Sequence, residues 1–254
     1  MNNWQDVLKA PAGGDHMVQV YQDREFLAAA VAEYVGTGLM QGEAAIIIAR
    51  PEHVREFRNA LWKRLDVDAA IGRGQLVLLD AQATLSRFMR DGMPAWTPFH
   101  EAIGGAIAEL RLSFPAVRAY GEMVDILWQK GERDAAIRLE EFWNDLAKLQ
   151  TFSLFCAYYM DNLDDRAYGG ALECVCKVHS HLIPARDYQR FDDTVAKAAE
   201  KVLDRPMMRM LLSMSSLEKP PAHMPLGQAM LFWMQKNMPA TAKKVLAEVR
   251  ASES

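Results

Sequence analysis

Short apolar runs alternate with longer amphipathic segments through much of the chain, and this alternation limits the possible folds more than any other feature. The runs at 16–21, 44–49, 75–81, 116–124 and 152–158 have the length and composition of strands. Between them, apolar residues recur at helical spacing in segments 23–39, 51–65, 84–114 and 133–149. Strands separated by such helices predict βαβ units and a mainly parallel sheet. Because parallel crossovers are right-handed, we expect an α/β three-layer sandwich.

The character of the sequence changes after residue 188. Four segments then read as helices, at 191–203, 206–217, 226–238 and 239–251, and 8 of the 15 methionines lie between residues 207 and 238. Methionine is flexible and polarisable, so Met-rich helices suit adaptable apolar contacts. We therefore predict a domain over 1–188 and a helical extension over 189–254. The extension either packs on the sheet or forms a surface for a homodimer or another partner.

Charge and composition exclude several classes of protein. The formal net charge is −4, which gives no overall attraction to nucleic acid, so we do not expect direct nucleic-acid binding. No apolar run reaches the roughly 20 residues that a membrane span needs, and the N-terminal residues lack the pattern of a secretory signal. Three cysteines do not form a disulfide framework. These observations predict a cytoplasmic protein without a membrane segment.

The turn after the first strand lacks a phosphate-binding loop. It reads "VYQDRE", with no glycine and no Lys-Ser/Thr pair, and it carries acidic residues where phosphates would bind. No GxGxxG follows any predicted strand, and no G-x-S-x-G motif is present. We therefore expect a non-enzymatic protein without a cofactor. An enzyme with an acid/base site around Glu122 and Arg118 ranks last among the alternatives, because the sequence shows no paired nucleophile and base.

The fourth predicted strand contains polar residues that a doubly covered strand should not have. Arg118, Tyr120 and Glu122 alternate in "VRAYGEMV" and share one side of an extended chain. One interpretation is a structural pair of Arg118 with Glu122, or a strand at the sheet edge. The other places Glu122 at the carboxyl end of the strand, where α/β sheets bind ligands.

Four other polar residues each allow a structural and a functional interpretation. Glu43 is either a turn residue or part of a ligand site, and Glu140 is either a solvated flank of its helix or half buried. His16, at the start of the first strand, is either a satisfied structural group or a ligand contact. Cys156, central in an apolar strand, is by default a buried, inert cysteine.

The stretch "CVCKVHSH" gathers Cys174, Cys176, His179 and His181. Neither a helix nor a strand points all four side chains at one ion, because their positions fall on different faces. We predict that 171–183 forms the last core helix of the domain. On such a helix only Cys176 and His179 lie close together, one turn apart. A metal site would then also require Cys156 or His16 at the same point.

Several motifs together resemble the MEDS domain, a sensory domain named after methanogens, methylotrophs and a dichloromethane-responsive repressor. They include "EFLAAAVAEYVGTGLMQGEAAIII", "GQLVLLDA", "VRAYGEMVDILWQKG" and "CKVHSHLIP", within residues 16–188. The resemblance implies a RecA-like core without a P-loop, and a small-molecule ligand such as a hydrocarbon derivative or a methylated compound. The positions that match the family pattern, as pocket or core residues, are His16, Tyr21, Gly42, Glu43, Arg118, Gly121, Glu122, Trp128, Glu140, Cys156, Cys176 and His179.

The resemblance also implies coupling to histidine kinases, anti-sigma kinases or DNA-binding domains. Residues 189–254 show neither kinase motifs nor a helix-turn-helix, so we expect the output to pass to a separate protein such as a histidine kinase or response regulator. The predicted function is small-molecule sensing, or a signalling adaptor, in bacterial signal transduction or transcription control. The alternative is a metal- or redox-sensing regulator that uses the cysteines and histidines.

Overall fold

A six-stranded sheet forms the centre of the computed structural model, which describes residues 4–161, 172–183, 188–217 and 224–253. The strands are β1 (His16–Tyr21), β2 (Ala44–Ala49), β3 (Leu76–Asp80), β6 (Val117–Gly121), β7 (Ser153–Tyr159) and β8 (His181–Ile183). They lie in the order β3-β2-β6-β7-β1-β8, and every pairing is parallel. The predicted parallel sheet is confirmed.

Helices cover both faces of this sheet. One face packs against α1 (Trp4–Lys9), α2 (Arg24–Met40), α3 (Pro51–Trp62) and α4 (Val67–Gly72). The other packs against α5 (Ala81–Phe88), α6 (Trp96–Phe99), a π-helical turn η1 (His100–Gly104), α7 (Gly105–Ser113), α8 (Met123–Gln129), α9 (Arg133–Leu149) and α10 (Leu172–Val178). A short antiparallel ribbon of β4 (Met89–Arg90) and β5 (Met93–Pro94) lies beyond α5. The three-layer sandwich predicted from the sequence is therefore confirmed.

The alternation of side chains along β2 shows why its apolar run is continuous. Ile46 and Ile48 belong to the core under α5 to α9, whereas Ala45 and Ile47 belong to the core under α1 to α4. All six residues of β2 are buried. A strand covered on both faces needs apolar residues at every position, and this run has them.

The turn from β1 into α2 closes the place where a phosphate would bind. Asp23 caps α2, and its carboxylate accepts hydrogen bonds from the backbone N–H groups of Glu25 and Phe26. Those N–H groups would otherwise point at an anion. The helix continues through Gly36 and Gly38 to Met40.

Two predicted boundaries are wrong. The fourth strand ends at Gly121, and α8 begins at Met123, so Glu122 lies at the junction between them. β6 is also a central strand, between β2 and β7, which excludes its placement at the sheet edge. Residues 171–183 do not form one helix, since α10 ends at Val178 and the chain then extends into β8 beside β1.

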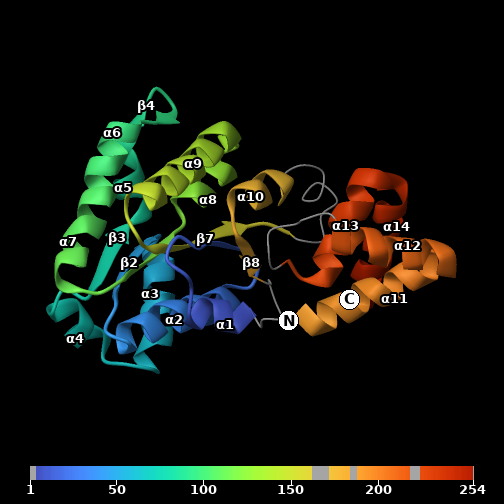
Figure 1. Ribbon diagram of the computed structural model, residues 1–254, viewed down its shortest axis with the longest axis horizontal. Helices are drawn as coiled ribbons and strands as arrows, with labels where there is room; N and C mark the ends of the chain where they lie inside the picture. Colours follow the sequence, from blue (N-terminus) through green and yellow to red (C-terminus); the bar gives the residue numbers. More distant parts are fainter. Residues whose placement is uncertain (1–3, 162–171, 184–187, 218–223, 254) are drawn as a thin grey trace.

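The last four helices pack mainly on one another. They are α11 (Tyr188–Val202), α12 (Arg205–Leu217), α13 (Leu226–Asn237) and α14 (Pro239–Glu253), and they form a bundle beside the sandwich (Figure 1). Met230 and Met234 of α13 are buried in it. The bundle helices contact one another most, and buried residues of the bundle such as Val195 belong to the same apolar core cluster as the sheet face under α5 to α10. Among the described helices, none combines the length and apolarity that a membrane crossing requires.

Candidate functional site

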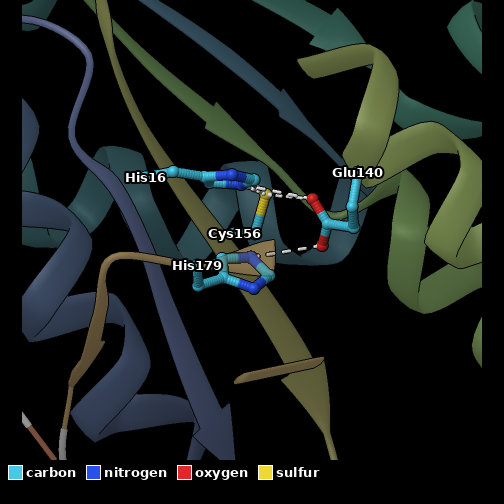
Figure 2. A group of neighbouring side chains, drawn as sticks. All are labelled: His16, Glu140, Cys156 and His179. Carbon is cyan, nitrogen blue, oxygen red and sulfur yellow. Dashed lines mark hydrogen bonds and ion pairs between the residues drawn. The ribbon is translucent and has the colours of Figure 1, made fainter. Parts of the chain in front are cut away.

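A buried polar cluster lies between the sheet and α9. It consists of His16 from β1, Glu140 from α9, Cys156 from β7, and His179 from the link between α10 and β8 (Figure 2). We call these four residues the buried cluster. Each is at most 6% exposed. One nitrogen, oxygen or sulfur atom from each side chain lies within 4.8 Å of the corresponding atoms of the other three. The prediction that Glu140 flanks its helix in solvent is wrong, since its side chain is fully buried.

Asn144 orients the ring of His16. The side-chain N–H of Asn144 donates to the carbonyl of Val178 at 2.9 Å, which leaves its oxygen 2.9 Å from Nδ1 of His16. Because that oxygen only accepts, Nδ1 of His16 carries a proton. In the neutral ring, Nε2 therefore presents a lone pair to the cluster. It lies 3.2 Å from Oε2 of Glu140 and 3.4 Å from Sγ of Cys156.

A backbone carbonyl fixes the ring of His179, as Asn144 fixes that of His16. Its Nδ1 lies 2.6 Å from the carbonyl of Val175 and must donate to it. Its Nε2 lies 3.3 Å from Oε1 of Glu140 but makes no hydrogen bond of acceptable geometry. The rings of His16 and His179 are 4.1 Å apart at their centroids. Burial, followed by the charge of His179, lowers the pKa of His16 and favours its neutral form.

The carboxylate of Glu140 is the centre of the network. Its Oε1 accepts a hydrogen bond from the hydroxyl of Tyr158 at 2.7 Å, and its Oε2 lies 3.5 Å from the thiol of Cys156. Burial opposes ionisation, but the two neighbouring histidines outweigh it and hold the pKa of Glu140 well below its usual range. A buried carboxylate of this kind requires compensating hydrogen bonds or a cation.

The thiol and the phenol beside Glu140 keep their protons. Burial, followed by the charge of Glu140, raises the pKa of Cys156 and of Tyr158 well above their usual values. A protonated thiol is a poor nucleophile and resists oxidation, so Cys156 is unreactive in this state. Trp128 contacts this network through Tyr158, since the two rings pack edge to face with their centroids 5.5 Å apart.

A second polar group lies at the carboxyl ends of the strands and is centred on Glu122. Its Oε2 is 2.6 Å from Nδ1 of His53 and 3.4 Å from the hydroxyl of Tyr120, and its Oε1 accepts from the backbone N–H of Arg50. Arg50 and His53 stand at the start of α3, directly after β2, and β2 is the neighbour of β6. In parallel sheets, this edge is where ligands bind.

Asp125 and Tyr21 complete this group, which we call the carboxyl-end cluster (Arg50, His53, Glu122, Asp125 and Tyr21). The guanidinium of Arg50 contacts Oδ2 of Asp125 at 2.8 Å. Burial raises the pKa of Asp125 even though Gln129, Arg50 and the backbone of Tyr159 hydrogen-bond to it. The ring of Tyr21 lies between those of His53 and Tyr159. Burial and the neighbouring carboxylates raise the pKa of Tyr21.

Arg118 belongs to neither cluster. Its Nε pairs with Glu43 at 2.5 Å, and its remaining donors reach the carbonyls of Leu8, Tyr34 and Lys9 and the side chain of Gln41. All five N–H groups of the guanidinium are thus engaged, so none remains for a ligand. The predicted pair of Arg118 with Glu122 does not form. Arg118 and Glu43 instead tie α1 and α2 to the amino end of the sheet.

Of the "CVCKVHSH" stretch, only His179 joins the buried cluster. Cys176 is buried on α10, outside the group of four, and burial raises its pKa to about 12. Cys174 is exposed, and His181 faces Asp15 at 3.1 Å. The predicted Cys176–His179 pair is therefore not the centre of a site. Both His16 and Cys156 do reach His179, which is the condition set from the sequence for a metal role.

Four residues that belong to or orient these two clusters were not predicted from the sequence. Asn144 follows Glu140 by four positions on one helix face, a spacing that could have indicated it. Arg50 and His53 follow directly after a predicted strand, where the carboxyl edge of a parallel sheet lies. Asp125 gave no such signal, because the strand was expected to continue to residue 124.

A comparison with protein-family models identifies a sensory family. A family model described as MEDS, the MEthanogen/methylotroph, DcmR Sensory domain, matches residues 15–180, which is more than half of the chain. All residues of the buried cluster and of the carboxyl-end cluster lie inside that segment, whereas α11 to α14 lie outside it. No curated protein matches the chain.

Proposed function

The chain belongs to the MEDS family of sensory domains, and from this premise we propose that it is a non-enzymatic small-molecule sensor or signalling adaptor. It acts in a bacterial signal-transduction or transcription-control pathway and passes its signal by protein–protein contact. The family supplies the sensory role. The carboxyl-end cluster supports the ligand-binding role, because buried polar groups from three strand ends converge where α/β sheets bind ligands.

The chemistry of the described residues favours sensing over catalysis. The N-terminus of α2, where a nucleotide phosphate would bind, is capped by Asp23. The buried thiol of Cys156 keeps its proton, which argues against both a covalent mechanism and a redox sensor based on this residue. The hydrogen-bond partners of Glu122 are His53, Tyr120 and the backbone of Arg50, and they include no serine, threonine, cysteine or lysine side chain.

Ligand binding can be tested with the full chain. Hydrocarbon derivatives and methylated compounds form the first panel, and native mass spectrometry and calorimetry detect a retained or added molecule. Glu122→Gln removes the charge that Arg50 and His53 face, so we expect it to weaken binding. The matched control is Glu141→Gln, since Glu141 is an exposed residue paired with Arg138 on the outer surface of α9. Equal binding by both variants would contradict a ligand site at Glu122.

The output is proposed to reach a histidine kinase, a response regulator or another signalling protein. Met210 and Met214 lie one turn apart on α12 and are 43% and 38% exposed, which supports a contact surface for a partner or a second copy. Affinity capture with the full chain should recover such a signalling protein. Replacing both methionines with glutamine should abolish the capture. Recovery of no signalling protein would count against the adaptor role.

A further inference from the structure

The buried cluster turns nitrogen, oxygen and sulfur atoms from four side chains toward one another. Val175 and Asn144 fix one proton of each histidine on Nδ1, so a ring without a second proton presents the lone pair of its Nε2 toward Glu140. Nε2 of His179 is buried and has no hydrogen-bond partner. Such lone pairs repel the ionised carboxylate, so the group needs a positive charge between them, which either a second ring proton or a bound metal ion supplies.

We propose that the buried cluster is a zinc site, in which its four side chains bind one Zn²⁺ ion. The spacing supports the proposal. Zinc bonds of about 2.0–2.1 Å to nitrogen or oxygen and about 2.3 Å to sulfur place tetrahedral ligand atoms about 3.3–3.6 Å apart. Oε2 of Glu140 lies 3.2 Å from Nε2 of His16 and 3.5 Å from Sγ of Cys156, and those two atoms are 3.4 Å apart. Nε2 of His179 lies 3.3 Å from the other oxygen, Oε1, and one ligand atom from each of the four residues lies within 4.8 Å of the rest.

The charges also match. On binding, Zn²⁺ takes the place of the thiol proton of Cys156, which leaves to solvent, and the sulfur becomes a thiolate ligand. Two neutral imidazoles, one carboxylate and one thiolate then carry two negative charges against the two positive charges of the ion. A neutral site is compatible with complete burial, whereas a carboxylate alone in that place is costly.

The surroundings resemble the outer shell that zinc sites use. In such sites each histidine ligand donates its other N–H to a carbonyl or carboxylate, which fixes the ring and its tautomer. The amide oxygen of Asn144 and the carbonyl of Val175 do this for the two rings here. Four protein ligands leave no open coordination position, so the site is structural rather than catalytic. It joins β1, β7, α9 and the link that leads into β8.

The test uses the full chain, stripped with a chelator and then given Zn²⁺ or Co²⁺ alone. We expect one metal ion per chain. Co²⁺ should give the intense visible bands of tetrahedral coordination together with a sulfur-to-cobalt charge-transfer band. Cys156→Ser should abolish the charge-transfer band. Cys176→Ser is the matched control, because Cys176 is also buried but lies outside the cluster, and it should keep the band.

Asn144→Ala provides a second, milder variant. It keeps all four ligands but frees the ring of His16, so the affinity for Zn²⁺ should fall by about 10–100-fold. Circular dichroism checks that each variant is folded, and the spectrum of the unmodified chain with Co²⁺ needs no variant. The proposal is overturned if the unmodified chain binds no stoichiometric metal or shows an octahedral cobalt spectrum. A charge-transfer band that survives Cys156→Ser would overturn it as well. Because the carboxyl-end cluster shares no residue with this site, none of these results decides the ligand-binding proposal.

Discussion

At the scale of single residues, Tyr158 shows how a buried charge constrains its neighbours. It is fully buried, and its hydroxyl donates to Glu140, whereas the next residue, Tyr159, is 50% exposed. Two adjacent tyrosines on one strand therefore have opposite environments. Replacing each tyrosine with phenylalanine removes the hydroxyl but keeps the ring, so the difference between the two variants reports the hydrogen bond of Tyr158 to Glu140.

We predict that Tyr158→Phe destabilises the protein by about 1.5–3 kcal/mol, the usual contribution of a hydrogen bond to a charged group. Tyr159→Phe keeps the ring contact with Tyr21 and should change stability by less than about 0.5 kcal/mol. Urea unfolding followed by circular dichroism measures both. Equal stabilities for the two variants would show that Glu140 does not depend on this hydrogen bond.

At the scale of elements, a glycine sets the contact between α2 and β6. A β-carbon at Gly38 would lie 2.6 Å from Cδ of Arg118, inside the van der Waals contact distance. The side chain of Arg118 could move only by giving up hydrogen bonds to α1 and α2. The absence of a side chain at Gly38 therefore allows the arginine to join these helices to the sheet.

Gly38→Ala should destabilise the protein by roughly 2–4 kcal/mol, because the shifted guanidinium leaves buried carbonyls without donors. Gly105→Ala is the matched control, since Gly105 lies in α7 with open space at its β-carbon position. There, the lower entropy of the unfolded chain should stabilise the protein by about 0.4–1 kcal/mol. Denaturant unfolding gives both changes in the free energy of unfolding. If both variants were destabilised or both stabilised, Gly38 would not be needed to make room for Arg118.

The contact between α11 and α13 should depend on pH. Asp192 accepts a hydrogen bond from the backbone N–H of Gly227 at 2.7 Å, yet burial, with a small addition from Asp193, raises its pKa. The folded chain therefore holds this proton more tightly than the unfolded chain. The contribution of Asp192 to stability thus falls as pH rises from its ordinary pKa through the raised one.

Asp192→Asn keeps an oxygen for the N–H of Gly227 and removes the ionisation. We expect the stability of this variant to fall less steeply with rising pH across the acidic range than that of the unmodified chain. Asp193→Asn, at an exposed neighbouring position, should largely keep the original slope. The measurement is the free energy of unfolding at a series of pH values. Parallel curves for the Asp192→Asn variant and the unmodified chain would refute the prediction.

The elements that periodicity could predict were those with one repeating pattern along their whole length. The apolar run of β2 and the helical repeat of α9 are such cases. Periodicity did not predict the structure of residues 171–183, because the short α10 and the three-residue β8 each have too few positions to show a period. β8 forms through its hydrogen bonds to β1, and that pairing is a tertiary contact.

The candidate site was predictable in part for a similar reason. His16, Glu140, Cys156 and His179 could each be singled out from the sequence, but their convergence could not, since they come from four separate elements. Local spacing instead favoured Cys176 as the partner of His179. The true neighbours of His179 depend on the register of β1 against β7 and β8, which no local pattern contains.

At the scale of the whole molecule, the helical bundle contacts mainly itself but shares an apolar core cluster with one face of the sandwich. Val195 and Met230 of the bundle belong to the same cluster of buried residues as Val175 of α10. Because α1 to α10 already lie on both faces of the sheet, we predict that a chain ending at residue 188 stays soluble and keeps the circular dichroism of an α/β protein. Light scattering then shows whether the bundle controls oligomeric state. An insoluble or unfolded product would show that the bundle is needed to cover the sheet.

The order of the strands has a consequence for the newly made chain. β1 is the first strand synthesised, yet its two neighbours in the sheet are β7 and β8, the last two. At about 5–20 residues per second, β1 waits on the order of ten seconds for residue 153 to be added. During that time an apolar strand is available to other nascent chains. Slower initiation, which spaces the ribosomes on one message, should therefore raise the yield of folded protein.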